Sequence, residues 1–494
     1  MLRLFPAVLL VCLPVFAEDL DNQVKRVIDA YTLVEQNAAD PVSSEQAFYQ
    51  GVIPGMLRRL DPHSVFFDPT QFEQLRRLET STQKGFGSVV SVLPGRVIVL
   101  QTFPGTPSAK SGMSPGDEIL AINNYRLDRL DLDQLVGLLQ QSKQQPAHLV
   151  IRRPGSLRLL EFTLTPEEMQ SPSVERAFLL KPGVGYLRVS SFDEKTGAQV
   201  KEAIEGLGGR KLKGLVLDLR NNPGGMLTAA VETVSLFLKP GLPILTVRGR
   251  AVAQKEEKVP EDAQPYDFPL ATLINGKSAS ASEIVAGALQ DHDRAVIVGE
   301  PSFGKGLVQS VFPLADSTGL ALTTALYYTP SGRSIQKPFD AAQFELGATA
   351  AHPNAKSDFR TDKGRLVRGG GGIMPDEVVY PADVSRFKAV MEASGAFTSF
   401  ATEYVQKHKV TERFEVTPSL LDDFRVYLAD RRIEPSLAEW SSEQDFIRNR
   451  LKTEIFNQTL GVAKGDEIEA QRDPQIQRAV QLISGRLNTA SLER

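Results

Sequence analysis

The sequence predicts a multidomain α/β protein with helical regions at both ends, and three observations support this prediction. The length of 494 residues is too great for a single ordinary core. Runs typical of buried strands alternate with amphipathic helical runs over residues 173–380, as expected for an α/β core. Short β-rich runs separated by Gly and Pro fill residues 84–168, whereas helical periodicity dominates residues 18–83 and 381–494.

The N-terminus has the composition of a secretory signal peptide. One Arg precedes an apolar run from Leu4 to Phe16, and Ala17 offers a small residue for cleavage. The run is too short to span a bilayer comfortably. We therefore predict a signal over residues 1–17 and an exported protein, periplasmic or otherwise extracytoplasmic, that meets a membrane only indirectly. Cys12 leaves a lipoprotein open as an alternative, although the residue before it is bulkier than lipidation signals usually accept.

The composition of the chain excludes several classes of function. The net charge is −4, and neither end of the chain is strongly basic, so no nucleic-acid partner is predicted. Once residues 1–17 are removed, the chain has no cysteine, and neither a disulfide nor a cysteine metal site can form. We predict no cofactor and no metal.

The segment from residue 18 to 83 predicts a helical arm. Apolar residues recur there at three- and four-residue spacing, and the arm closes with Leu60-Asp61-Pro62-His63-Ser64. His63 is a candidate catalytic residue. A histidine that follows proline at a helix end more commonly makes a local hydrogen bond, however, and this is the role that we expect.

Residues 84–168 contain two characteristic glycine-bearing stretches. The first is Gly85-Phe86-Gly87-Ser88-Val89, and the second is Pro107-Ser108-Ala109-Lys110-Ser111-Gly112-Met113-Ser114-Pro115-Gly116-Asp117-Glu118-Ile119. They resemble the carboxylate loop and the core motif of a PDZ domain. Such a loop points backbone N–H groups at a chain-terminal carboxylate while the peptide adds a strand to the sheet edge. The resemblance implies that the first stretch binds peptides. An ordinary β-barrel whose glycines only make turns is the alternative.

A strand-to-helix turn within residues 173–380 favours anions. The buried-strand run Leu215-Val216-Leu217-Asp218-Leu219 breaks at Arg220-Asn221-Asn222-Pro223-Gly224-Gly225, and a helical run follows. A glycine pair between a strand and a helix exposes backbone N–H groups, which suit a negative charge. Alone, this turn is weak evidence, because such turns often contain glycine.

A serine at the start of a later helix is a candidate nucleophile. Residues 271–274 predict a strand and residues 281–290 a helix, which puts Ser280 in the turn between them. The N–H of Ala281 and the positive end of the helix dipole would then stabilise an oxyanion formed when Ser280 Oγ attacks a carbonyl. The N–H groups of the earlier glycine pair, Gly224 or Gly225, are the natural second donors.

A serine hydroxyl needs a base, and lysine is the better candidate. Of the five histidines only His292 is near in sequence, and at about 1.5 Å per helical residue it lies far from Ser280. Lys305 lies between two glycines, where close approach and burial could hold its amine neutral as a general base. If this piece is helical, Gln309 shares a face with Lys305 and could orient the amine.

Each of these pieces also has a purely structural interpretation. Ser278, Ser280 and Ser282 could be helix-capping hydroxyls. The Gly-Lys-Gly loop could bind phosphate, although the G-x-x-x-x-G-K-[ST] motif is absent because Gly306 follows the lysine. From the residues alone, the Ser-Lys pair and the structural interpretation stay equally open.

The stretch Ser278-Ala279-Ser280-Ala281-Ser282-Glu283 with Ser302-Phe303-Gly304-Lys305-Gly306 resembles the active-site signature of the C-terminal processing, or tail-specific, serine peptidases. In that family the middle serine is the nucleophile, the lysine follows 25 positions later (305 − 280 = 25), and a glutamine follows four after it. These positions are Ser280, Lys305 and Gln309. The resemblance extends over roughly residues 20–380 and includes the following segments: Leu60-Asp61-Pro62-His63-Ser64, the PDZ-like segment, residues 217–225, residues 328–336 and residues 370–376.

The resemblance implies a crotonase-like α/β peptidase core with an inserted PDZ domain, an oxyanion hole from Ala281 and a glycine of the Gly224-Gly225 pair, and often a homodimer. It implies an exported endopeptidase that captures apolar C-termini and cleaves through an acyl-enzyme with Ser280 and Lys305. The predicted partners are therefore proteins or peptides with apolar C-termini. The alternatives are a scaffold that binds C-termini through a silent peptidase fold, and a hydrolase of small esters.

Overall fold

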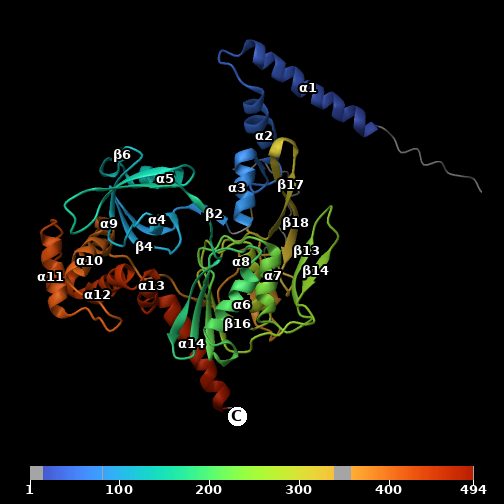
Figure 1. The fold of residues 1–494 in the computed structure, drawn as a ribbon. Coiled ribbons are helices and arrows are strands. Elements are labelled where there is room, and N and C mark those ends of the chain that lie inside the picture. The colour runs from blue at the N-terminus through green and yellow to red at the C-terminus, as the bar shows by residue number, and fades with distance from the viewer. Residues whose placement is uncertain (1–14, 80–81, 339–357, 493–494) are drawn as a thin grey trace, which may run out of the picture. The chain divides into compact units, whose positions relative to one another are not determined.

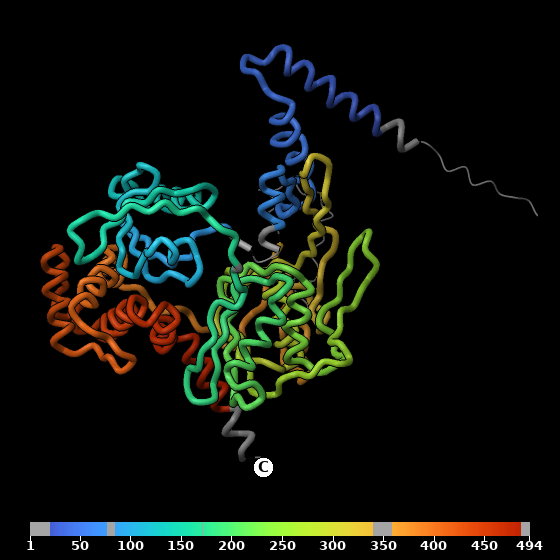
Figure 2. The backbone as a smooth tube through the Cα atoms, in the orientation of Figure 1, coloured from blue at the N-terminus to red at the C-terminus, as the bar shows by residue number. Residues whose placement is uncertain are grey.

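The computed structural model describes residues 15–79, 82–338 and 358–492 of the chain, so most of the predicted leader lies outside the described residues. The described chain forms two compact units. The smaller unit contains residues 15–73 and 309–323, and the larger unit contains the rest. The path of the chain through both units can be followed in Figures 1 and 2.

The smaller unit is mainly helical at its N-terminal side, as predicted. Its helices are α1 (Val15–Asn37), the π-helix η1 (Gln46–Val52), α2 (Ile53–Leu57) and the start of α3 (Pro69–Glu79). Its strands are β1 (Val65–Phe67), most of β17 (Leu307–Pro313) and the first half of β18 (Gly319–Tyr328), with the 3₁₀ turn η4 (Ala315–Ser317) before β18. β1 pairs antiparallel with β18.

The Asp61-Pro62-His63-Ser64 turn lies in the smaller unit, and the local hydrogen bond expected of the His63 side chain stays a prediction. The side chain of Asp61 accepts from the backbone N–H groups of His63 and Ser64, at 2.7 and 2.8 Å. The hydroxyl of Ser64 donates to the other oxygen of Asp61. Asp61 therefore closes the turn that leads from α2 into β1.

In the larger unit, residues 84–168 form an antiparallel sheet with the order β3-β4-β5-β7-β8, in which β6 pairs β5. The elements are β3 (Ser88–Leu93), β4 (Arg96–Thr102), α4 (Pro107–Lys110), β5 (Glu118–Ile122), β6 (Tyr125–Arg126), η2 (Leu127–Arg129), α5 (Leu132–Ser142), β7 (Ala147–Arg152) and β8 (Leu160–Leu164). These elements enclose a core of their own. Two strands, β2 (Thr82–Gly85) and β9 (Glu167–Gln170), pair at the entry and exit of this sheet.

The α/β core contains a six-stranded sheet with the order β10-β11-β12-β15-β16-β21. The strands are β10 (Val174–Lys181), β11 (Val184–Val189), β12 (Gly214–Asp218), β15 (Leu270–Ile274), β16 (Ala295–Gly299) and β21 (Glu377–Val378). β10 is antiparallel to β11, and every other neighbouring pair is parallel. The central strands read as unbroken apolar runs because both of their faces are covered.

Two cores lie on the two faces of this sheet. Alternate residues of β12 divide between them: Leu215 and Leu217 pack with α6 (Thr196–Gly206), α7 (Leu227–Ser235) and α8 (Ala281–Asp291), whereas Val216 packs with the C-terminal helix α14 (Pro474–Leu492). This alternation follows from the two-residue period of a strand. Helix α14 therefore covers one face of the six-stranded sheet (Figure 1).

Further strands of the larger unit border the core. They are β13 (Pro243–Arg248), which pairs with β14 (Lys255–Lys258) and with the second half of β18, and the hairpin β19 (Asp358–Arg360) with β20 (Leu366–Arg368). The 3₁₀ turn η3 (Gly209–Lys211) precedes β12.

The remaining C-terminal helices form another cluster with its own core. They are α9 (Arg386–Ser394), α10 (Ala396–Lys407), α11 (Pro418–Ala429), α12 (Leu437–Thr459) and α13 (Val462–Ala470). Within residues 15–79, 82–338 and 358–492, no helix is both long and apolar enough to cross a membrane. The α/β multidomain fold with helical regions at both ends is confirmed; the exact domain boundaries stay a prediction.

Candidate active site

The three segments that the sequence singled out follow neighbouring parallel strands. The Arg220-to-Gly225 turn comes after β12, Ser280 after β15 and Lys305 after β16. The carboxyl ends of parallel strands meet at one edge of a sheet, which is where open α/β sheets commonly place their ligands. The topology therefore brings the three segments together.

The first two segments are joined by hydrogen bonds. The buried Asn222 accepts at its backbone oxygen from the N–H of Ala279 and from the hydroxyl of Ser282, both at 3.0 Å. The hydroxyl of Ser278 donates to the carbonyl of Leu219 at 2.8 Å. Ser278 and Ser282 thus hold the two turns together, whereas Ser280 is the N-cap residue of α8 and forms a capping box with Glu283.

Ser280 has a strained backbone. Its φ of 52° and ψ of −114° belong to a region that normally requires glycine. Such a conformation costs about 1–3 kcal/mol and persists only where the surroundings impose it. Its carbonyl accepts from the N–H groups of Glu283 and Ile284, and from the hydroxyl of Tyr327 at 3.2 Å. Strain of this kind is characteristic of a serine held on a sharp strand-to-helix turn for catalysis.

Glu283, which the sequence analysis did not assign, links the serine turn to the lysine loop. One carboxylate oxygen accepts from the N–H groups of Ser280 and Lys305, both at 2.9 Å. The other accepts from the N–H of Gly304 at 2.7 Å and from the hydroxyl of Ser302. Burial raises the pKa of Glu283, and these hydrogen bonds offset the effect only in part. A single buried side chain therefore fixes the backbone at both candidate catalytic positions.

Replacing Glu283 by glutamine is expected to lower kcat by about 100-fold, because a misplacement of about 1 Å can cost that much. Whichever way the amide is turned, its NH₂ group faces at least one backbone N–H that the carboxylate accepted. The free energy of unfolding should fall by about 1–3 kcal/mol through the unsatisfied donors. Steady-state kinetics and denaturant unfolding measure both effects.

The matched control is Glu439→Gln, since Glu439 caps the N–H of Ser436 at the exposed start of α12 in the same way. It should leave kcat unchanged. The pH dependence supplies a second check. Because the pKa of Glu283 is raised in the folded state, its stabilising contribution is complete at low pH and is lost as the pH rises through that pKa. Glu283→Gln should remove this slope, and a variant with the wild-type slope and kcat would contradict the role of Glu283.

The backbone donors predicted for an oxyanion differ in their availability. Among the described residues, no acceptor takes the N–H of Ala281 or that of Gly225, whereas the N–H of Gly224 donates to Asn222 Oδ1 at 2.8 Å. A Cβ on Gly224 would lie 2.8 Å from Cβ of Ser280 and 2.9 Å from the N of Ala281. Glycine is thus required at this close approach, and of the two glycines Gly225 has the available donor.

Lys305 is partly buried and its loop is fixed on both sides. Its carbonyl accepts from the hydroxyl of Tyr327 at 3.0 Å, the same hydroxyl that reaches the carbonyl of Ser280. Burial and the nearby charge of Glu283 raise the pKa of Tyr327 well above its usual value, so it stays a donor.

The premise that linked Gln309 to Lys305 is wrong. Gln309 lies on strand β17 and not on a helix, so the four-residue spacing does not place the two side chains on a common helical face. In the smaller unit, Gln309 Nε2 donates to the carbonyl of His63 at 2.5 Å. A catalytic role for Gln309 stays a proposal on the resemblance alone.

The predicted peptide-binding loop has the features of a carboxylate site. Gly85 ends β2, and Ser88 and Val89 begin β3. The carbonyl of Phe86 accepts from the N–H of Ser108, and that of Gly87 from the N–H of Phe103, both at 2.9 Å. No acceptor among the described residues takes the N–H of Phe86 or Gly87. The loop is thus held by its carbonyl groups while these two donors stay available.

Strand β3 is also placed to accept a peptide. Among the described strands it pairs with β4 alone and so forms an edge of its sheet, and α5 packs against it. On α5, Leu132 and Val136 are exposed at a four-residue spacing. No group of three or more His, Cys, Asp or Glu that could hold a metal occurs among the described residues.

Comparison with known proteins agrees with these features. Residues 183–341 match the model of peptidase family S41, and residues 99–153 match that of the PDZ domain. The carboxy-terminal-processing protease of Bartonella bacilliformis is 39% identical over 303 residues, which are 60% of this chain and 68% of the relative. The carboxyl-terminal-processing protease of Synechocystis sp. is 35% identical over 313 residues, or 62% of this chain and 73% of the relative.

The fold and the site therefore define a PDZ-containing serine peptidase. The chain belongs to the carboxy-terminal-processing proteases of peptidase family S41. The predictions of this family, of a PDZ domain and of an enzyme of this class are confirmed. The family match contains Ser280, Lys305 and both glycines of the earlier turn.

Proposed function

We propose that the protein is an exported endopeptidase that recognises C-terminal tails through its PDZ domain and cleaves with Ser280 as nucleophile and Lys305 as general base. The observation that supports this most strongly is the strained backbone of Ser280. It lies beside the available N–H of Ala281 and is tied to the lysine loop through Glu283. The apolar run of residues 4–16 supports export.

The proposed reaction has two stages. Lys305 Nζ takes the proton of Ser280 Oγ as the oxygen attacks the scissile carbonyl carbon, and the N–H groups of Ala281 and Gly225 stabilise the oxyanion. The C–N bond then breaks as Lys305 returns the proton to the leaving amine, which leaves an ester on Ser280. Water attacks this ester while Lys305 accepts a proton from the water, and the serine hydroxyl is restored as the acid product leaves.

Capture of the tail would use the loop and edge strand of the PDZ domain. The N–H groups of Phe86 and Gly87 suit a terminal carboxylate, and the free edge of β3 suits an added strand. The exposed Leu132 and Val136 favour apolar side chains near the terminus. Gly87 has a φ of 73°, and a Cβ there would lie 2.2 Å from Cβ of Thr106, so only glycine permits this loop.

The test is cleavage of an unfolded protein in two versions that differ only at the tail. One version ends in three apolar residues, and the other ends in the same residues with a C-terminal amide. We expect kcat/KM to fall by at least about 10-fold for the amide, because it lacks the charge that the loop donors would bind. Electrophoresis of the fragments over time measures this.

The alternatives give different results in the same assay. Binding without fragments would favour a scaffold that holds C-termini, and turnover of small esters without proteolysis would favour an esterase. Equal cleavage of both substrates would contradict recognition of the carboxylate. Ser280→Ala is the control that separates this peptidase from a contaminating one.

A further inference from the structure

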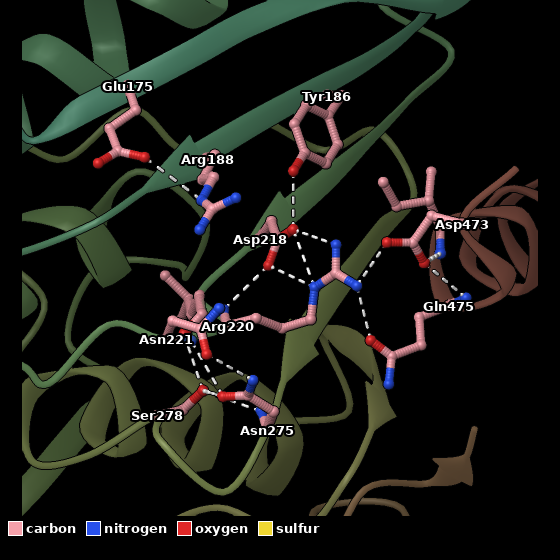
Figure 3. A network of polar contacts seen from close by, with 12 residues as sticks. Glu175, Tyr186, Arg188, Asp218, Arg220, Asn221, Asn275, Ser278, Asp473 and Gln475 are labelled. Atoms are coloured by element: carbon pink, nitrogen blue, oxygen red, sulfur yellow. Dashed lines mark hydrogen bonds and ion pairs between the residues drawn. The ribbon is translucent and has the colours of Figure 1, made fainter. Parts of the chain in front are cut away.

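The first residue of the glycine turn has its side chain held by the C-terminal region of the chain. Arg220 lies two residues after Asp218, the last residue of β12, and four residues before Gly224. Its guanidinium is largely buried between two carboxylates, those of Asp218 and Asp473. Figure 3 shows this guanidinium lying between Asp218 on one side and Asp473 with Gln475 on the other.

On the side of the α/β core, Asp218 accepts several hydrogen bonds from Arg220. Its carboxylate accepts from the backbone N–H of Arg220 at 2.9 Å, and from Nε and Nη2 of the side chain at 3.0 and 2.6 Å. Asp218 is fully buried, and the hydroxyl of Tyr186 donates to it at 2.7 Å. Burial acts to lower the pKa of Arg220, but Asp218 and then Asp473 more than offset this, so its pKa is raised.

On the C-terminal side, the partners belong to the start of α14. Nη1 of Arg220 donates to Asp473 Oδ2 at 2.7 Å and to Gln475 Oε1 at 2.6 Å. The other oxygen of Asp473 accepts from the N–H groups of Gln475 and Ile476, so the residue also caps the helix. Gln475 is buried and donates to the carbonyl of Val379. These partners are therefore themselves fixed.

Helix α14 gives this contact a rigid support. Its apolar residues Ile476, Ala479 and Ile483 are buried against β12, β15 and β16, the strands whose ends hold the candidate active site. A planar guanidinium that bonds carboxylates on both sides resists displacement in its own plane. The position of Arg220, and through it the entry to the glycine turn, is thus set from residues more than 250 positions away.

We infer that Arg220 is a positioning residue for the peptidase reaction, and that Asp473 and Gln475 of the C-terminal region act through it to hold the Gly224-Gly225 turn against Ser280. The inference rests on the proposed function. Besides covering one face of the sheet, the C-terminal region would then help to position the backbone N–H groups that stabilise the oxyanion. Because the guanidinium of Arg220 is bonded to Asp218, Asp473 and Gln475, we expect it to affect the rate of the chemical step and not substrate binding.

The experiment compares Asp473→Asn with Asp466→Asn in the full chain. Asp466 on α13 pairs with Arg176 on β10, so it joins the same C-terminal region to the same sheet, and its side chain is 26% exposed against 23% for Asp473. We expect Asp473→Asn to lower kcat by about 10-fold with KM changed by less than about two-fold. The rate at which a fluorophosphonate modifies Ser280 should fall in parallel. Asp466→Asn should leave both rates at the wild-type level.

A further variant separates positioning from stability. Asp473→Glu keeps the charge and should recover part of the lost rate, although its thermal stability need not recover. A kcat of Asp473→Asn equal to that of wild type, or an equal loss in Asp466→Asn, would overturn the inference. Both outcomes are distinct from failure of the proposed function, in which Ser280→Ala would cleave as fast as wild type.

Discussion

Replacement of Ser280 by alanine is expected to lower kcat/KM for an unfolded protein substrate by at least about ten-thousand-fold, since nucleophilic attack is lost and only binding and oxyanion stabilisation remain. The fold should persist. The contacts that hold this residue in its strained conformation are made by its backbone N–H and carbonyl, which alanine retains. Cleavage kinetics and the thermal midpoint of unfolding measure the two quantities.

The control for this variant is Ser282→Ala, two residues further along. The hydroxyl of Ser282 donates to the carbonyl of Asn222, so its loss should reduce the free energy of unfolding by about 1 kcal/mol. Cleavage should survive in that variant. If Ser282→Ala were inactive and Ser280→Ala active, the nucleophile would be assigned to the wrong serine.

The second large effect is expected for Lys305→Met, which keeps the length of the side chain and removes its amine. Without a base, the hydroxyl of Ser280 stays protonated and attacks slowly, so kcat should fall by about 1,000-fold or more. The backbone N–H of Lys305 still donates to Glu283, so the loop should keep its shape. Single-turnover kinetics at several pH values measure the chemical step directly.

Lys277→Met supplies the comparison, because Lys277 is an exposed lysine in the turn that precedes Ser280. We expect wild-type rates for it. A Lys305→Met enzyme that kept full activity across the pH range would show that another group accepts the proton.

Much of the site could be predicted from local patterns. The strand and helix around Ser280 were predicted at residues 271–274 and 281–290, and the structure has β15 at Leu270–Ile274 and α8 at Ala281–Asp291. Apolar periodicity and a break at small polar residues are enough for such elements. The parallel order of the strands then explains why segments some 25 to 60 residues apart meet at one sheet edge.

Contacts between distant segments could not be predicted in this way. The Ser-x-x-Glu spacing of Ser280 and Glu283 is a capping pattern and could have indicated the bond to the Ser280 N–H. No local pattern indicates that the carboxylate of Glu283 also accepts hydrogen bonds from the backbone N–H groups of Gly304 and Lys305. Likewise, an Asp-Pro pair at 473–474 predicts a helix start but not its partner Arg220.

The helical premise for Gln309 failed for a related reason. The spacing of four residues between Lys305 and Gln309 suits a helix, yet the segment forms strand β17 and pairs with β18. Pairing between strands depends on tertiary contacts, which local secondary-structure propensity does not report. The hydrogen bond from the N–H of Gly224 to Asn222 Oδ1, which makes Gly225 the donor that we propose, could not be predicted from the sequence either.

The central claim is that Ser280 is the nucleophile, and modification by a fluorophosphonate followed by peptide mass spectrometry tests it most directly. The account predicts a single adduct on Ser280 in the wild-type protein, no adduct on Ser278 or Ser282, and much slower formation in Lys305→Met. An adduct on a different serine, or a modification rate that Lys305→Met leaves unchanged, would contradict the account.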